Sequence, residues 1–272
     1  MFNIQRALVT GGSSGIGRSI VQHLLDDGCE VFSLSRTVLP PQAFRHAERL
    51  HQIACDLTQD EAVARAFQAV SAETDHLDAV FSNAGFGISG EISRTDRAHV
   101  RRQFDLNVVS ACDVVRRAVP LLKPVGGRII FTSSVAGVII IPYQAFYSAT
   151  KACLNAFAVA LNNELKSTGI RAIAVMPGDT ATGFTDGRIK IEDPDTPEGR
   201  CCIESVKKME HDERTGTDPD IIARRIVRIA RKPRPKALYG IGALYRIALV
   251  LYKVLPVRLT EWIIGKVYGG KA

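Results

Sequence analysis

Short apolar runs rich in β-branched residues alternate with longer amphipathic stretches through the first 180 residues of this 272-residue chain. Six runs are predicted to be strands: Ala7–Val9, Val31–Leu34, Gln52–Cys55, Ala79–Ser82, Arg128–Thr132 and Ala172–Val175. Four stretches are predicted to be helices: Ile16–Asp27, Asp60–Ala72, Arg97–Leu122 and Ala145–Ser167. Apolar strands separated by helices predict a parallel α/β sheet with helices on both faces. Right-handed crossovers make it doubly wound, and such sheets bind ligands beyond the carboxyl ends of their strands.

The second part of the chain changes character. Residues 179–217 are polar and rich in Thr, Asp, Glu and Pro, which is typical of a functional or mobile loop. Three further elements are predicted: a short helix near Glu198–Glu210, a helix over Ile221–Ala230 and a last strand over Ala237–Tyr239. We therefore expect a single Rossmann-type domain of about seven strands over residues 1–240 and an amphipathic helical extension over 241–272.

The net charge of +7 is concentrated near the end of the chain. Residues 231–272 hold nine Lys or Arg and a single acid, Glu261, so this segment carries +8 and the first 230 residues carry −1. Because the positive charge lies in the tail and the first 230 residues are nearly neutral, we do not expect nucleic-acid binding across the main domain.

The six cysteines include no CxxC pair and lie near no histidine cluster, so no metal site is expected. Reduced thiols and an N-terminus without a secretory signal pattern favour a cytoplasmic protein.

A glycine-rich turn, Thr10-Gly-Gly-Ser-Ser-Gly-Ile-Gly17, follows the first predicted strand and opens a helix. Glycines let the backbone turn tightly and approach a pyrophosphate, and the helix N-terminus offers free N–H groups to the anion. The turn alone could be a tight connection. Its position between strand and helix favours a nucleotide site.

The spacing TGxxxGxG resembles the short-chain dehydrogenase/reductase family. Asp56-Leu57, Asn83-Ala84-Gly85, Pro177-Gly178 and Thr182 stand where that family has matching motifs, and the resemblance covers roughly residues 4–240. It implies a dinucleotide cofactor bound by Gly11, Ser13, Ser14, Gly15, Ile16, Gly17, Ser35, Arg36, Asp56, Leu57, Asn83, Ala84, Gly85, Tyr147, Lys151, Pro177, Gly178, Thr180 and Thr182.

The end of the second strand predicts NADP, with NADPH preferred over NADH. An NAD site usually has an acid there for the ribose hydroxyls, and that acid would repel a 2′-phosphate. This chain has Ser35 and Arg36 instead, and arginine is a planar donor suited to phosphate. The alternative is a solvated surface arginine.

Tyr147 and Lys151 are four residues apart at the start of a predicted helix, so both side chains can reach one pocket. A phenol has a pKa of about 10, and a neighbouring ammonium favours phenolate, so we expect the pKa of Tyr147 to be lowered. Most Tyr–Lys pairs at this spacing have only a structural role. Tyr143 lacks a lysine partner and is excluded.

The family resemblance adds Ser134, after the fifth strand, and Asn107, within a helix. It implies that Ser134 holds the substrate oxygen, Tyr147 exchanges the proton, Lys151 tunes Tyr147 and binds the nicotinamide ribose, and Asn107 positions a water. The adjacent Ser133 is a competitor for the role of Ser134.

The tail has apolar residues at helical spacing: Leu244, Ile247, Ala248, Leu251, Val254, Leu255, Leu259, Trp262, Ile263, Val267 and Tyr268. Arg246, Lys253, Arg258 and Lys266 interrupt it, so it cannot supply the ~20 apolar residues of a membrane span. Three interpretations remain: packing on its own domain or a partner subunit, a lid over an apolar pocket, and a basic anchor on an anionic membrane surface. The first two are favoured.

The tail resembles those of retinol- and steroid-converting members of the family, which implies a hydrophobic alcohol or ketone as substrate. The leading hypothesis is an NADP(H)-dependent oxidoreductase, working as a homodimer or homotetramer. The alternatives are a non-catalytic NADP-binding sensor or scaffold and a peripheral membrane protein that uses the basic tail.

Overall fold

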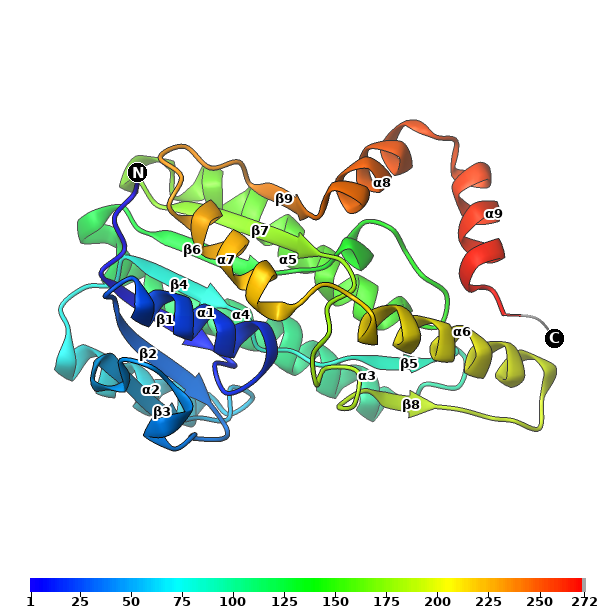
Figure 1. The fold of residues 1–272 in the computed structure, drawn as a ribbon, viewed down its shortest axis with the longest axis horizontal. Helices are drawn as coiled ribbons and strands as arrows, with labels where there is room; N and C mark the ends of the chain where they lie inside the picture. Colours follow the sequence, from blue (N-terminus) through cyan, green and yellow to red (C-terminus); the bar gives the residue numbers. More distant parts are fainter. Residues whose placement is uncertain (271–272) are drawn as a thin grey trace.

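Seven parallel strands form one sheet in the computed structural model, which describes residues 1–270 (Figure 1). The strand order is β3-β2-β1-β4-β6-β7-β9. The strands are β1 (Arg6–Thr10), β2 (Glu30–Ser35), β3 (Leu50–Ala54), β4 (Ala79–Ser82), β6 (Arg128–Thr132), β7 (Arg171–Pro177) and β9 (Leu238–Ile241). The order reverses direction between β1 and β4, and a doubly wound sheet binds ligands beyond such a switch point. The predicted fold class is confirmed.

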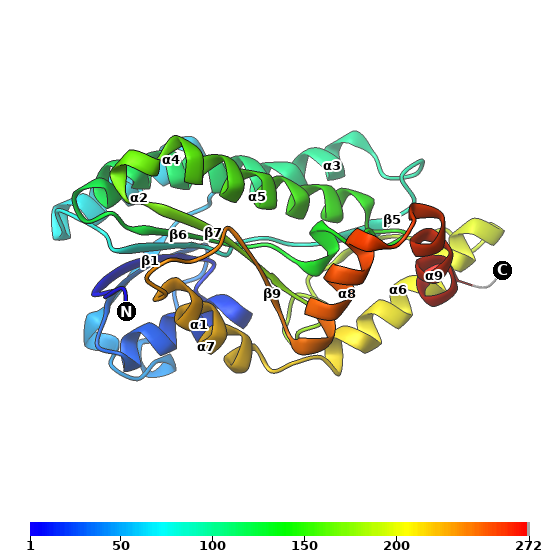
Figure 2. The same ribbon diagram turned by 90° about the horizontal axis from the view of Figure 1, so that it is seen from above.

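Helices cover both faces of this sheet (Figure 2). One layer holds α2 (Asp60–Glu73), α4 (Ser110–Leu122) and α5 (Ala145–Glu164), and the other holds α1 (Gly15–Asp26) and α7 (Pro219–Ala230). The remaining α-helices are α3 (Arg97–Phe104), α6 (Pro197–Arg214), α8 (Ala243–Val254) and α9 (Val257–Tyr268).

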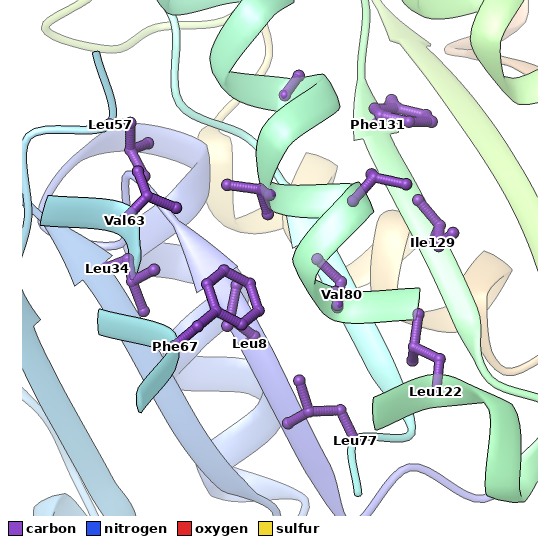
Figure 3. Packing of buried hydrophobic residues seen from close by; sticks show 14 of the residues in the cluster. Leu8, Leu34, Leu57, Val63, Phe67, Leu77, Val80, Leu122, Ile129 and Phe131 are labelled. Atoms are coloured by element: carbon purple, nitrogen blue, oxygen red, sulfur yellow. The ribbon is translucent and has the colours of Figure 1, made fainter. Parts of the chain in front are cut away.

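The core consists of two apolar clusters, one on each face of the sheet. Figure 3 shows the first, where Val63 and Phe67 of α2 face Leu8 and Leu34 of the strands. Leu8 and Leu34 are fully buried, and each such side chain contributes roughly 1.5–3 kcal/mol of transfer free energy. Burial on both faces explains why the strands are continuous apolar runs rather than alternating ones.

Two local features differ from the predictions. The helix predicted over Arg97–Leu122 is divided, because the segment Asp105–Val109 between α3 and α4 has π-helical hydrogen bonds. A second, two-stranded parallel sheet pairs β5 (Ile88–Gly90) with β8 (Ile189–Ile191), inside the segment expected to be a loop. Strands of three residues are too short to leave a periodic pattern in the sequence.

The tail is helical, as expected, and its last two residues, including Lys271, lie outside the described part of the chain. It begins later than predicted, because β9 extends to Ile241 and α8 starts at Ala243. In Figure 1, α8 and α9 stand out from the body at the end of the molecule where α6 lies. Within residues 1–270, no helix has the length and hydropathy that crossing a membrane requires.

Candidate active site

A cavity of about 1050 Å³ lies at the carboxyl ends of the strands. Its wall includes every predicted cofactor-binding residue except Gly17, together with Ser134. Residues from α6, α8 and α9 close the other end of it, among them Met209, Leu244 and Ile264. One continuous space therefore joins the glycine-rich turn, the Tyr147–Lys151 pair and the tail.

The shape of the glycine-rich turn depends on glycines, which have no Cβ atom. Gly11 has a φ of +69°, which a residue with a Cβ adopts rarely. A Cβ on Gly17 would overlap the Gly11 carbonyl and the Asn83 amide, so Gly17 lies behind the cavity wall and lets the turn close. Thr10 Oγ1 accepts hydrogen bonds from the backbone N–H groups of Asn83 and Ala84, at 2.9 and 3.1 Å. This contact joins β1 to the end of β4. No motif in the sequence indicates this role of Thr10.

At the far end of β2, Ser35 and Arg36 line the cavity in different ways. Ser35 is buried, and its hydroxyl has no hydrogen-bond partner among the described residues. Arg36 is exposed. Hydrogen bonds from the Thr58 backbone and hydroxyl lower the pKa of the Asp56 carboxyl, and the charge of Arg36 lowers it further. The exposed guanidinium, at a strand end without an acid, suits a phosphate-bearing ribose.

Tyr147 and Lys151 lie on the first turns of α5 and both face the cavity. The Lys151 ammonium is 5.6 Å from the centre of the Tyr147 ring, and its Nζ donates a 2.8 Å hydrogen bond to the Thr132 carbonyl. The Tyr147 ring also packs against Phe184, with ring centres 5.5 Å apart.

The expected lowering of the Tyr147 pKa is wrong for this structure. Burial raises the pKa of Tyr147 to about 12, although a hydrogen bond with Ser134 acts in the opposite direction. Burial also lowers the pKa of Lys151 to about 8. The loss of solvation dominates, so Tyr147 carries its proton at neutral pH, as a proton donor must.

The structure separates the two candidate serines. The Ser133 hydroxyl donates a 2.9 Å hydrogen bond to the Lys151 carbonyl, which turns it toward α5. Ser134 hydrogen-bonds with Tyr147 at the cavity wall and accepts a 3.1 Å bond from the Ala136 backbone N–H. Ser134 is therefore the serine placed beside the phenol.

Asn107 does not line the cavity, and it lies buried in the π-helical segment behind it. Its amide accepts a 3.0 Å bond from the Phe86 N–H and donates to the Phe86 carbonyl and the Thr150 hydroxyl. The side chain thus joins the Asn83–Gly85 turn to α5. These contacts make Asn107 a positioning residue, and its expected role in holding a water stays a prediction.

Sequence reasoning missed a buried ion pair near the phenol. Arg188 and Glu213 pair with each other, and the Thr185 hydroxyl donates a 2.7 Å bond to the second oxygen of Glu213. Glu213 lines the cavity, and its charge raises the pKa of Tyr147 while that of Arg188 lowers it. Both lie in the polar segment, where no motif distinguishes them from solvated charges.

The tail also contacts the site directly. The Tyr245 ring of α8 occupies the space that a Cβ on Gly178 would need, and its hydroxyl donates a 2.6 Å bond to Asp179. On α9, the Tyr268 hydroxyl donates a 3.2 Å bond to Asp212. Burial raises the pKa of Tyr245 to about 12. These two contacts attach the tail helices to the cavity rim.

Among residues 1–270, no group of His, Cys, Asp or Glu is arranged to hold a metal ion. The cavity places a phenol, an ammonium and a hydroxyl beside a turn shaped for a pyrophosphate. The sequence model of the family described as "short chain dehydrogenase" matches residues 5–192, which is more than half of the chain. The chain belongs to the short-chain dehydrogenase family.

Three similar proteins illustrate the relationship. This chain is 32% identical over 260 residues to the uncharacterized oxidoreductase YbbO of Escherichia coli. The match covers 94% of this chain and 93% of the relative. The chain is also 29% identical to a 3-ketodihydrosphingosine reductase of Bacteroides thetaiotaomicron, over 89% and 90% of the two chains. The crystal structure of a short-chain dehydrogenase from Streptomyces avermitilis shares its fold, with a TM-score of 0.82, 24% identity and 96% of each chain covered.

Proposed function

We propose that this protein reduces the carbonyl group of a hydrophobic ketone to an alcohol with NADPH. The observation that carries the proposal is the protonated phenol of Tyr147, placed beside Ser134 and Lys151 in a cavity that also contains the glycine-rich turn. Its raised pKa keeps the proton on Tyr147 at neutral pH, which is the state that carbonyl reduction requires of a proton donor.

NADPH, when bound, supplies the hydride that adds to the carbonyl carbon. Tyr147 donates its proton to the substrate oxygen, and Ser134 donates a hydrogen bond to the same oxygen and offsets its developing charge. Lys151 stabilises the phenolate that is left on Tyr147. Its burial makes that attraction stronger than it would be in water.

The residues present fit a dinucleotide phosphate. The N-terminus of α1 and the turn around Gly15 face the cavity and would hold the pyrophosphate. Arg36 would hold the 2′-phosphate, and Ser35 puts no acid there to repel it. The preference for NADP over NAD rests on these two residues.

The substrate class rests on the end of the cavity beyond Tyr147. Its wall is apolar there and comes from loops and the tail: Ile139, Ile141, Leu244, Ala248, Ile264 and Val267. The name of the Bacteroides relative, a reductase of a keto-sphingoid, agrees with a long-chain keto-lipid. We further propose that the protein works in the cytoplasm as a homodimer or homotetramer.

A turnover screen tests this function. NADPH oxidation is measured with long-chain keto-lipids, steroid ketones, retinoids and short ketones, for the wild type and for Tyr147→Phe. We expect turnover with at least one hydrophobic ketone and a loss of at least about a thousandfold in Tyr147→Phe, because the variant has no proton to donate. NADPH binding, followed by fluorescence, should be nearly unchanged.

The matched control is Tyr143→Phe, which removes a hydroxyl four residues earlier from a side chain outside the cavity wall. It should keep wild-type turnover. NADPH binding without turnover on any ketone would instead favour the sensor or scaffold function, and substantial turnover by Tyr147→Phe would refute its role as the acid.

A further inference from the structure

The two tail helices present apolar side chains to solvent as well as to the cavity. Those that are exposed and do not line the cavity are Ile247, Val250, Leu251, Val254, Val257, Leu259, Trp262 and Ile263. We call these eight residues the outer face. Val254 is 70% exposed and Trp262 is 61% exposed. Soluble proteins rarely expose a contiguous apolar surface of this kind without a binding partner.

The outer face is organised by helical spacing. On α8, Ile247, Leu251 and Val254 recur every three or four residues, so they form one stripe. The opposite side of α8 carries the buried Leu249, which packs against Val135 and Met176 of the body. α8 therefore has one apolar side that stabilises the fold and another that the described chain leaves uncovered. On α9, Tyr268 packs against the buried cluster of Cys202, Val206 and Met209, while Trp262 and Ile263 are exposed.

Exposed cations border the outer face. Arg246 and Lys253 lie on α8, seven residues apart and hence on one side, and Arg258 and Lys266 lie on α9. Glu261 is the single acid on the two helices. A surface of apolar side chains edged by cations, with an exposed tryptophan, complements the anionic interface of a phospholipid bilayer.

The charge pattern disfavours a second copy of this chain as the occupant. A two-fold contact brings the same patch of both copies together, so four cations on one copy would face four on the other. Glu261 alone does not compensate them. An anionic surface compensates all four.

The outer face continues into the mouth of the cavity. Leu244 and Val267 line the cavity wall and are also 73% and 44% exposed, one on each tail helix. We propose that α8 and α9 dock on an anionic membrane surface and that the cavity takes its hydrophobic substrate directly from the bilayer. This proposal rests on the proposed function for the substrate, but the docking itself does not.

Vesicle flotation tests the docking separately from activity. The full-length protein is mixed with vesicles of phosphatidylcholine alone or with added phosphatidylglycerol. We expect flotation with the anionic vesicles and its loss at high salt. Leu251→Glu and Trp262→Glu should each weaken vesicle binding about tenfold or more, because a carboxylate then has to enter the interface. The control Ile221→Glu, an exposed apolar residue of α7, should float like the wild type.

Charge reversal provides the second test. Lys253→Glu/Arg258→Glu should weaken binding to anionic vesicles by about tenfold or more, since each basic residue near such a surface contributes to the affinity. Arg225→Glu/Arg228→Glu, a matched pair of exposed cations on α7, should not. Each variant is also assayed for NADPH binding, which should be unchanged, and for turnover of a long-chain ketone carried in vesicles, which should fall with docking.

Two results would overturn the proposal. One is a wild-type protein that stays with the soluble fraction in the presence of anionic vesicles. The other is a dimer in light scattering that Leu251→Glu converts to a monomer, without flotation, which would assign the outer face to a second copy. If the protein floats with the vesicles but reduces no ketone, the docking proposal stands and the proposed substrate class is refuted.

Discussion

At the scale of a single side chain, the proposed preference for NADP rests on Arg36. It is exposed at the cavity wall beside the buried Ser35, where an acid would select NAD. Arg36→Asp should weaken NADPH binding by about ten- to a hundredfold, because a charge-assisted phosphate contact is worth about 1.5–3 kcal/mol and the new carboxylate repels the phosphate. NADH binding should change far less. Titration of both cofactors measures this, with Arg225→Asp as a surface control, and equal losses for the two cofactors would refute the assignment.

The pKa of Lys151 predicts how the rate of reduction depends on pH. With a pKa of about 8, it is an ammonium below pH 8 and a neutral amine above it, whereas Tyr147, with a pKa of about 12, stays protonated throughout. The ammonium stabilises the phenolate that forms when the proton leaves. We therefore expect kcat/KM for reduction to be level below pH 8 and to fall about tenfold per pH unit above it.

The measurement is a pH profile of kcat/KM for the wild type and for Lys151→Arg. The guanidinium keeps its charge over this range, so whatever turnover Lys151→Arg retains should show no decline near pH 8. The same decline in both proteins would place the titrating group elsewhere.

The sequence could predict that Tyr147, Lys151 and Ser134 meet at the site but not their ionisation. Tyr147, Lys151 and Ser134 line one cavity as their spacing suggested. The direction of the Tyr147 shift depends on how much water burial removes, which is a tertiary property and leaves no local pattern. The hydrogen bond that turns Ser133 toward Lys151 is equally tertiary, and it separates two adjacent serines that look alike in the sequence.

At the scale of elements, the buried Arg188–Glu213 pair joins the β8 segment to α6 next to the phenol. Arg188 is 1% exposed and Glu213 is 15% exposed in their side chains. Arg188→Met should lower the free energy of unfolding by roughly 3–5 kcal/mol, because it leaves a carboxylate without its partner in a poorly solvated place. Urea unfolding measures the loss.

The double variant Arg188→Met/Glu213→Met should be less destabilised than Arg188→Met, since it removes both charges. A double variant at least as unstable as the sum of the two single ones would show that the pair does not act through its charges.

Element prediction succeeded where periodicity is strong and failed where it is short or interrupted. The six early strands and four long helices were placed within a few residues. The π-helical turn at Asp105–Val109 was not, because the residues on both sides of it keep a helical pattern. It places Asn107 against Phe86 and Thr150, so one irregular turn connects three elements.

At the scale of the whole molecule, one cavity is assembled from two stretches of chain with different sequence signals. The cofactor end comes from motifs between Gly11 and Thr182 that match the family. The substrate end comes from Ile139 and Ile141 and largely from α6, α8 and α9, which lie beyond the matched residues 5–192. Contacts there, such as Tyr245 over Gly178, depend on how the tail folds back, and no spacing rule predicts them.

This division has a consequence for how such a protein can diversify. Every residue proposed to bind the nucleotide precedes residue 192, and the helices that close the substrate end follow it, so recombination near residue 192 could exchange those helices while leaving the nucleotide site almost unaltered. The constraint on any such exchange is local: an incoming segment would have to present a flat ring over Gly178, or the backbone at Gly178 would lose its support.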